Sequence, residues 1–441
     1  MPDELSAEHI VTLRKNFLAE PTNQLMQNAL TRSSVDDVAL DRQIVVTTDT
    51  SVSHRLDDWI VTDQKKSGRC WLFAGLNLLR VDAAKAMNVK EFEFSQNHLM
   101  FWDKLERSNY FLEAIVETAD RDIDDRTVAY LLDQVSNDGG QWNMFVALVR
   151  KHGLVPKSAM PETYSSSNTA RLNEILQRVL RRGALAVRAA GGEVEQRECK
   201  NEILETVHRV LTMHLGTPPE QFEWQWTDKD KVFHRDGSLT PQAFAEKYVT
   251  LPLEDYVCLV HDPRSSSPQN RTFTVEYLGN VIGAPPVVYL NVDLAVMKQA
   301  AMDTITGGEP VWFGCDVAKM MNNELGIWDA RLYDLDAVYG ASLELDKADR
   351  LLAHDTVMTH AMLFSGVDVA DGAPRKWRVE NSWGAEMADQ GFWTMNTNWF
   401  DEFVFEVAVR RDHLTAELQE AAKAEPIVLP AWDPMGALAQ G

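Results

Sequence analysis

Cysteine is scarce in this chain, and its spacing argues against a metal-binding or disulfide-rich protein. The 441 residues include four cysteines, and no two of them form the Cys-x-x-Cys pair of a structural zinc site. Their wide separation also differs from the dense disulfide framework of small secreted domains. We therefore expect free thiols, no metal ion and no cofactor. The four are Cys70, Cys199, Cys258 and Cys315.

The chain also lacks a long hydrophobic run and an excess of basic residues. No stretch reaches the roughly 18 uninterrupted apolar residues of a membrane span. Residues 1–6 are partly acidic and lack the apolar core of a signal peptide, so we expect a cytoplasmic protein without membrane contact. Acidic residues outnumber basic ones by 66 to 43, which gives a net charge of −23. Because nucleic-acid binding normally requires a basic surface, we expect no such partner.

The remaining composition is that of an ordinary globular protein, 45% hydrophobic and 25% charged, and the length allows two or three domains. Apolar residues at helical spacing predict helices over residues 67–87, 96–105, 110–118, 127–135, 142–151 and 168–215, the last interrupted at Gly191-Gly192. Runs of β-branched and aromatic residues predict strands over residues 44–48, 256–260, 272–277, 287–292, 311–313, 357–368, 377–381, 392–395 and 403–409. This order predicts an α+β fold.

Four residues, in the order Gln64, Cys70, His360 and Asn381, carry the chemistry that we predict. A free thiol is only a few per cent ionised at neutral pH, whereas a helix N-terminus and a neighbouring histidine both favour the thiolate. Cys70 begins a predicted apolar helix, which supplies the first of these effects. An asparagine amide can orient the imidazole, and a glutamine amide can donate to the oxyanion of a tetrahedral intermediate. These are the parts of a papain-type cysteine protease site.

Each of these residues has an ordinary structural explanation when it is taken alone. Buried cysteines usually pack as small apolar groups, and the Asn-Ser-Trp-Gly sequence at 381–384 is typical of a turn after a strand. A purely structural explanation of the whole set requires four coincidences in the right order. We therefore interpret Cys70 as the nucleophile, His360 as the acid and base, Asn381 as the group that orients it, and Gln64 as the oxyanion donor.

Three further motifs carry a resemblance to a known family. They are Asn-Asp-Gly-Gly-Gln-Trp at 137–142, Phe-His-Arg-Asp-Gly at 233–237, and Ala-Trp-Asp-Pro-Met-Gly-Ala-Leu-Ala at 431–439. Together with the four site residues, they make most of the chain similar to the bleomycin hydrolase and aminopeptidase C family of papain-like cysteine peptidases. The resemblance implies a papain-like two-lobed fold, in which a helical half faces a β half across a cleft.

The long separation of Cys70 and His360 implies an added module, because compact papain-like enzymes separate these residues by less than half as much. We divide the chain into an N-terminal extension (1–54), the helical half (55–165), an inserted helical and hook module (166–300), the β half (301–411) and a C-terminal tail (412–441). The resemblance implies that the module makes contacts between subunits. The resemblance also implies a homo-oligomer, namely a hexamer.

The resemblance also assigns residues to the substrate cleft. Gly139 and Gly140 would let an extended substrate backbone approach closely, because they have no side chains. Asp138 would be either a helix terminator or a polar group of the cleft. Trp383 would pack over the catalytic asparagine. Ala439, near the end of the tail, would lie in the non-primed side of the cleft and leave room for one residue before the scissile bond.

The leading interpretation is a cytoplasmic cysteine aminopeptidase that acts on peptides with a free N-terminus, with bleomycin-like amides as further substrates. Two alternatives use the same fold: a non-catalytic oligomeric scaffold, and a thiol acyltransferase or thiolactone hydrolase. The resemblance implies that the enzyme trims its own C-terminus. We therefore expect Gln440-Gly441, which extend beyond the usual Gly-Ala-Leu-Ala ending, to be removed, so that Ala439 or a neighbour presents the working carboxylate.

Overall fold

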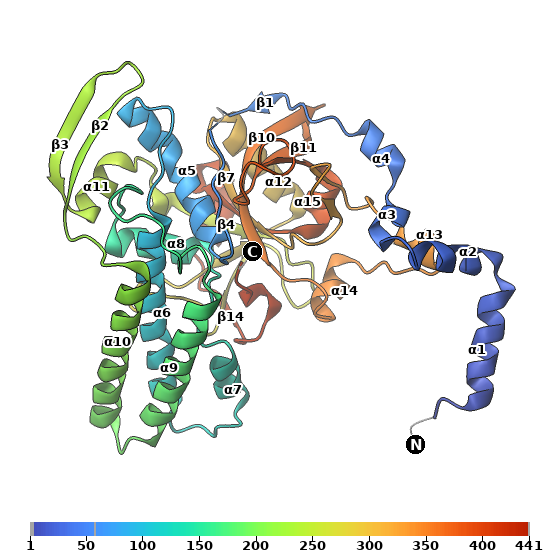
Figure 1. Ribbon diagram of the computed structural model, residues 1–441, viewed down its shortest axis with the longest axis horizontal. Coiled ribbons are helices and arrows are strands. Elements are labelled where there is room, and N and C mark those ends of the chain that lie inside the picture. The colour runs from blue at the N-terminus through green and yellow to red at the C-terminus, as the bar shows by residue number, and fades with distance from the viewer. Residues whose placement is uncertain (1–3, 57–58, 440–441) are drawn as a thin grey trace.

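A helical layer packs against one large sheet, and helix α5 (Cys70–Met87) lies between them (Figure 1). The computed structural model describes residues 4–56 and 59–439. The first three turns of α5 are buried on nearly every side. Apart from Asn77 and Arg80, their sequence is apolar around the whole helix, which is typical of a helix enclosed by protein. The residue that begins α5 therefore lies at the boundary between the two layers.

Three long helices lie side by side in the helical layer: α6 (Gln96–Glu117), α9 (Ala170–Ala189) and α10 (Glu193–Leu215). Shorter helices complete it, namely α7 (Arg126–Asp133), α8 (Trp142–His152) and α11 (Pro241–Tyr248). Strands β2 (Phe222–Thr227) and β3 (Phe233–Leu239) form a separate hairpin that projects from this side of the molecule (Figure 1).

Twelve strands form a single mixed sheet within the part of the chain that the structure describes. Their order is β14-β5-β6-β4-β13-β7-β10-β11-β12-β9-β8, and β1 pairs with β10. The bounds are β1 (His54–Arg55), β4 (Tyr256–Val260), β5 (Arg271–Val275), β6 (Tyr289–Asn291), β7 (Val311–Cys315), β8 (Met321–Asn322), β9 (Ile327–Trp328), β10 (His360–Ala370), β11 (Ala373–Glu380), β12 (Phe392–Asn396), β13 (Val404–Arg410) and β14 (Ile427–Leu429).

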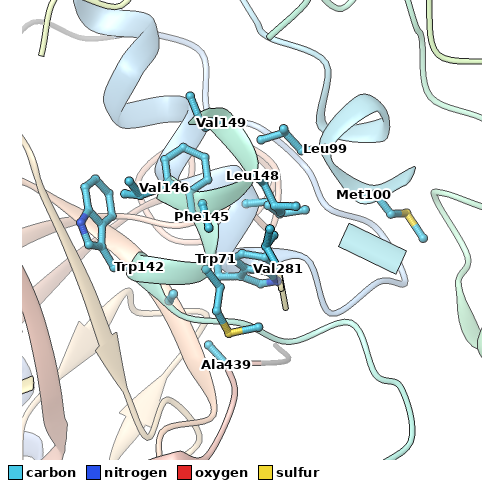
Figure 2. Packing of buried hydrophobic residues seen from close by; sticks show 14 of the residues in the cluster. Trp71, Leu99, Met100, Trp142, Phe145, Val146, Leu148, Val149, Val281 and Ala439 are labelled. Carbon is cyan, nitrogen blue, oxygen red and sulfur yellow. The ribbon is translucent and has the colours of Figure 1, made fainter. Parts of the chain in front are cut away.

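Two hydrophobic cores cover the two faces of this sheet. One lies between the sheet and the helical layer and contains Trp71, Trp142 and Ala439 (Figure 2). The other lies beyond the sheet, where α12 (Leu294–Thr306) and α15 (Thr397–Phe403) pack. Alternate residues of β7 contribute to each, with Trp312 in the first core and Phe313 in the second, as the period of a strand requires.

The N-terminal segment is an arm of short helices: α1 (Ala7–Ala19), α2 (Pro21–Leu30), α3 (Val35–Ala39) and α4 (Arg42–Thr47). Helix α1 buries no residue and points away from the rest of the molecule (Figure 1). The other short helices are α13 (Leu335–Tyr339), α14 (Lys347–Leu352) and α16 (Ala416–Ala421). None of the helices in 4–56 and 59–439 combines the length and apolar character needed to cross a membrane.

Most of the long predicted elements are confirmed, including α5 and the pair α9 and α10 separated at Gly191-Gly192. The strand predicted over residues 44–48 is wrong, because this segment belongs to helix α4. The Asp41 carboxylate accepts hydrogen bonds from the backbone N–H groups of Gln43 and Ile44, at 2.7 and 3.2 Å, and caps that helix. The helices predicted over 96–105 and 110–118 are one continuous helix, α6.

Helices α11 and α12 were not predicted, and the sheet extends further back in the sequence than expected. Strands β4, β5 and β6, between residues 256 and 291, belong to the same sheet as β7 and β10 to β13. The sheet therefore begins well before residue 301, where the sequence analysis set the start of the β half. Strand β4 pairs with β13 near the C-terminus, so this boundary cannot be seen from local sequence patterns.

Candidate active site

Cys70 is the first residue of α5 and is completely buried. Burial raises the pKa of its thiol to about 12, because a thiolate in this position is poorly solvated. The backbone N–H groups of Ala361 and Trp71 lie beside the sulfur and act in the opposite direction on the pKa. The thiol therefore occupies the predicted helix N-terminus, and its contact with Ala361 places it next to the start of β10.

His360 and Asn381 are joined by a hydrogen bond of 2.8 Å between His360 Nε2 and Asn381 Oδ1. His360 is the first residue of β10 and Asn381 directly follows β11, which pairs with β10. The second ring nitrogen, Nδ1, is buried and has no hydrogen-bond partner within residues 4–56 and 59–439. Burial lowers the pKa of His360 to about 4, and the bond to Asn381 opposes this effect. One nitrogen is thus fixed and the other is available.

Neither Cys70 nor His360 can readily carry a charge alone. Burial disfavours an isolated thiolate and an isolated imidazolium. Transfer of one proton from Cys70 Sγ to His360 Nδ1 creates both charges together, and each then stabilises the other. This arrangement fits a nucleophile that is activated by its own base. Trp383 lies against the same imidazole, with 4.9 Å between the ring centroids, and shields it.

Gln64 is held in the loop before α5 by hydrogen bonds on three sides. Its backbone N–H donates to the Ser382 carbonyl at 2.9 Å, and the Ser382 hydroxyl donates to Gln64 Oε1 at 2.7 Å. Gln64 Nε2 donates to the Ser67 carbonyl at 2.5 Å. Since an amide nitrogen carries two hydrogens, this bond uses one and leaves one donor for a ligand. The contact with Ser382 ties Gln64 to the residue after Asn381.

Asp138 organises the loop below the site instead of facing a substrate. Its carboxylate pairs with Lys104 Nζ at 2.7 Å and accepts hydrogen bonds from Asn173 Nδ2 at 2.9 Å, the Gly68 N–H at 3.1 Å and the Thr169 hydroxyl. Although burial acts against ionisation, these partners hold the pKa of the Asp138 carboxyl well below its usual range. Both oxygens are used within the protein, which favours a structural role for Asp138 over the alternative role as a polar group of the cleft.

Gly139 and Gly140 lie directly over Trp71. A Cβ atom on Gly140 would come within 2.4 Å of the Trp71 ring, so this position excludes a side chain. The Trp71 indole N–H donates to the Asp138 carbonyl at 2.7 Å, and Arg107 Nη2 donates to the Gly139 carbonyl at 2.7 Å. The glycine pair is therefore fixed from below, and its backbone is left to pair on the opposite side.

The C-terminal tail supplies the pairing partner of Gly140. The Gly140 N–H donates to the Ala439 carbonyl at 3.2 Å, and the Ala439 N–H donates to the Gly140 carbonyl at 3.3 Å. Ala439 is fully buried and belongs to the same apolar cluster as Trp71 (Figure 2). Gln141 Nε2 donates to the Ala437 carbonyl at 2.8 Å. Gln440-Gly441 and their predicted removal lie outside the described residues.

A cavity of about 480 Å³ lies along the tail. Its walls include Asn137, which lies two residues before Gly139, and Thr359, which directly precedes His360. Residues 436–438 of the tail form another part of its wall. The tail therefore bounds this cavity on one side.

A buried polar network around Glu380 was not predicted from the sequence. The Glu380 carboxylate accepts hydrogen bonds from Arg80 at 2.8 Å, Asn77 at 3.0 Å and the Trp59 indole at 2.6 Å. Arg80 and Asn77 belong to the helix that begins with Cys70, and Glu380 directly precedes Asn381. The network therefore connects the elements that carry the two residues. A signal was present, since Arg80 and Asn77 interrupt an otherwise apolar helix.

The other cysteines, Cys199, Cys258 and Cys315, are free thiols. Among residues 4–56 and 59–439, no group of three or more histidine, cysteine, aspartate and glutamate side chains is placed to hold a metal ion. In the acidic segment 120–125, the Asp125 carboxylate caps helix α7 by accepting hydrogen bonds from the N–H groups of Thr127 and Val128. Its role there is structural.

Comparison with known proteins identifies the family. Residues 4–436 match the model of the Peptidase C1-like family. The chain is 41% identical to aminopeptidase C of Listeria monocytogenes over 440 residues, covering all of both chains, and 43% identical to bleomycin hydrolase of Gallus gallus over 450 residues, covering 99% of each. The crystal structure of PepW from Lactobacillus rhamnosis HN001 matches with a TM-score of 0.97 at 40% identity, over the full length of both chains.

These matches extend over the whole length of the chain, so they include the inserted module and the tail as well as the site. The expected papain-like α+β fold and the expected resemblance are both confirmed. The chain belongs to the Peptidase C1-like family, whose members include aminopeptidase C and bleomycin hydrolase.

Proposed function

We propose that this protein is a cysteine aminopeptidase that hydrolyses the N-terminal bond of peptides with a free α-amine, and related amides of the bleomycin type. The observation that carries the proposal is His360, whose Nε2 is fixed by Asn381 while Nδ1 is unpartnered among the described residues, next to a thiol at a helix N-terminus. The names of the relatives, aminopeptidase C and bleomycin hydrolase, support the reaction class.

In the first half of the reaction, Cys70 Sγ bonds to the carbonyl carbon of the N-terminal residue as its proton passes to His360 Nδ1. The oxyanion is stabilised by the free Nε2 hydrogen of Gln64 and by the backbone N–H of Cys70. His360 then gives its proton to the leaving amine as the C–N bond breaks. In the second half, His360 deprotonates water, which attacks the thioester and releases the free amino acid and the thiol.

The tail accounts for the restriction to one residue before the scissile bond. Ala439 already forms with Gly140 the pair of backbone hydrogen bonds that an extended substrate would otherwise form. A peptide that continued in the N-terminal direction would compete with the tail for this position. A substrate that ends at its α-amine avoids the competition.

Hydrolysis of an aminoacyl amide with a free α-amine, compared with an N-acetylated dipeptide amide, tests the proposal. We expect cleavage of the first substrate, and we expect Cys70→Ala to reduce its kcat/KM by several orders of magnitude. Cys199→Ser is the matched control, because this thiol lies on α10, outside the site. Substantial turnover by purified Cys70→Ala, with the fold intact by circular dichroism, contradicts the assignment.

We further propose that the protein is a cytoplasmic homohexamer. Helix α1 exposes Ile10, Leu13 and Phe17 on a helix that buries nothing, and the β2–β3 hairpin also projects from the body (Figure 1). Both features are suited to contacts with other subunits. Light scattering should give about 300 kDa for six copies of the 49.8 kDa chain. A monomer at micromolar concentration refutes this part of the proposal.

A further inference from the structure

The last described residues of the tail are held by two side chains in addition to the backbone of Gly140. Gln141 Nε2 donates to the Ala437 carbonyl at 2.8 Å. The Tyr289 hydroxyl lies 3.2 Å from the Met435 carbonyl and also donates to Gln141 Oε1. Gln141 therefore contacts the tail directly, and Tyr289 contacts both the tail and Gln141.

The Ala437 carbonyl and the Tyr289 hydroxyl contact opposite ends of the Gln141 amide. The Ala437 carbonyl can only accept, so it requires Nε2 to face the tail, since the reverse orientation would place two oxygens against each other. The Tyr289 hydroxyl then donates to Oε1 and holds the amide in that orientation. Tyr289 lies on β6 and is 1% exposed, so solvent does not compete for these hydrogen bonds.

From this geometry we propose that Gln141 and Tyr289 form a clamp that sets the position of residues 435–439 and thereby maintains the preference for substrates with a free α-amine. The inference rests on the proposed function, in which the tail blocks the non-primed side of the cleft. Both are positioning residues, because neither is placed to take part in bond making or breaking.

The clamp is separate from the anchors that attach the tail to the protein. Further back, Asp433 pairs with Arg264 through two hydrogen bonds of 2.9 and 3.1 Å, and the Arg126 guanidinium lies 3.9 Å from the centroid of the Trp432 ring. These contacts keep the tail attached when the clamp is removed. Loss of the clamp should therefore loosen residues 435–439 without releasing the whole tail.

Tyr289→Phe tests this directly, because it removes the hydroxyl and retains the buried ring. A hydrogen bond of this kind contributes about 0.5–1.5 kcal/mol net, which corresponds to a change in tail occupancy of roughly 2- to 12-fold. We expect kcat/KM for the N-acetylated dipeptide amide to rise by that factor relative to the free aminoacyl amide. Tyr256→Phe, which removes a hydroxyl from a buried tyrosine on β4 outside the clamp, should leave the ratio unchanged.

Deletion of residues 436–441 shows the substrate preference without the tail and is the reference. Two further variants are Gln141→Met alone and Gln141→Met combined with Tyr289→Phe. If Tyr289 acts through Gln141, the double variant should show about the same ratio as Gln141→Met alone. Suppose that the deletion changes the ratio of the two kcat/KM values, but Tyr289→Phe leaves the ratio unchanged or changes both kcat/KM values equally. This result overturns the clamp but not the role of the tail. A deletion that leaves the ratio unchanged overturns the proposed role of the tail, and the clamp with it.

Discussion

Glu406 is a buried carboxyl group whose ionisation should control the stability of the interface between the sheet and the helical layer. It lies on β13 with 2% of its surface exposed, and its Oε1 has no hydrogen-bond partner in the described part of the chain. Burial raises the pKa of Glu406 from 4.5 to about 7, and a hydrogen bond with the Cys258 thiol opposes this only in part. Burial is the main reason that the pKa of the clamp residue Tyr289 is raised, and the negative charge of Glu406 raises it further.

The size and sign of the effect follow from the two pKa values. A pKa that is higher in the folded than in the unfolded protein contributes stability that is present below pH 4.5 and is lost as pH rises through 7. The full rise corresponds to about 3 kcal/mol in the free energy of unfolding. Between pH 5 and pH 8, the loss is about 2.5 kcal/mol. Glu406→Gln abolishes this titration, so the variant should gain stability relative to the parent over the same interval.

Thermal unfolding at pH 5 and pH 8 measures the difference. For a chain of this length, about 2.5 kcal/mol corresponds to a relative change in Tm of about 2–3 °C. The criterion is how the Tm difference between variant and parent changes with pH. The absolute Tm of the variant also depends on whether the new amide finds hydrogen-bond partners, which does not vary with pH. Glu417→Gln, at an exposed position on α16, is the control and should show no pH-dependent difference from the parent. Equal Tm differences at the two pH values for Glu406→Gln would refute the reasoning.

Two further substitutions test the site itself. Gln64→Ala should lower kcat by roughly 10²–10³ at a temperature where the variant is fully folded, because the lost donor acts on the oxyanion; a fall in kcat of less than about tenfold would exclude that role. Gly140→Ala should lower the Tm and raise cleavage of the N-acetylated substrate, because the new Cβ would come within 2.4 Å of the Trp71 ring and displace the backbone that pairs with Ala439. A variant with the parent's Tm and selectivity would show that Trp71 moves aside.

The residues of the proposed catalytic site stand out in the sequence because each is marked by its local context. Cys70 begins an apolar helix, His360 begins a strand, and Asn381 follows one, and the structure has these elements where the patterns indicated. Fold and family followed from the same residues with the motifs around Gly140 and Ala439. Helix and strand periodicity are properties of neighbouring residues, so they can be read without knowledge of the tertiary structure.

Predictions failed where a contact distant in the sequence, or a single capping residue, decides the outcome. Residues 44–48 are rich in β-branched side chains, but the Asp41 cap makes them helical. The role of Asp138 stayed open between a helix terminator and a cleft group, because only the tertiary structure brings Lys104 on α6 to its carboxylate. The sheet's true extent depends on the pairing of β4 with β13, which are far apart in the chain.

The network around Glu380 shows why the site depends on residues that do no chemistry. Cys70, the proposed nucleophile, begins a helix next to the helical layer, whereas His360 and Asn381 are at the sheet, so the distances between them depend on how the two layers are aligned. Arg80 and Glu380 form an ion pair between them that is almost completely buried. Such a pair often adds little stability, because its desolvation offsets the attraction, but it is satisfied in only one alignment. Because Glu380 immediately precedes Asn381 and Arg80 lies on the Cys70 helix, the pair fixes the alignment of the two elements that carry the proposed catalytic residues.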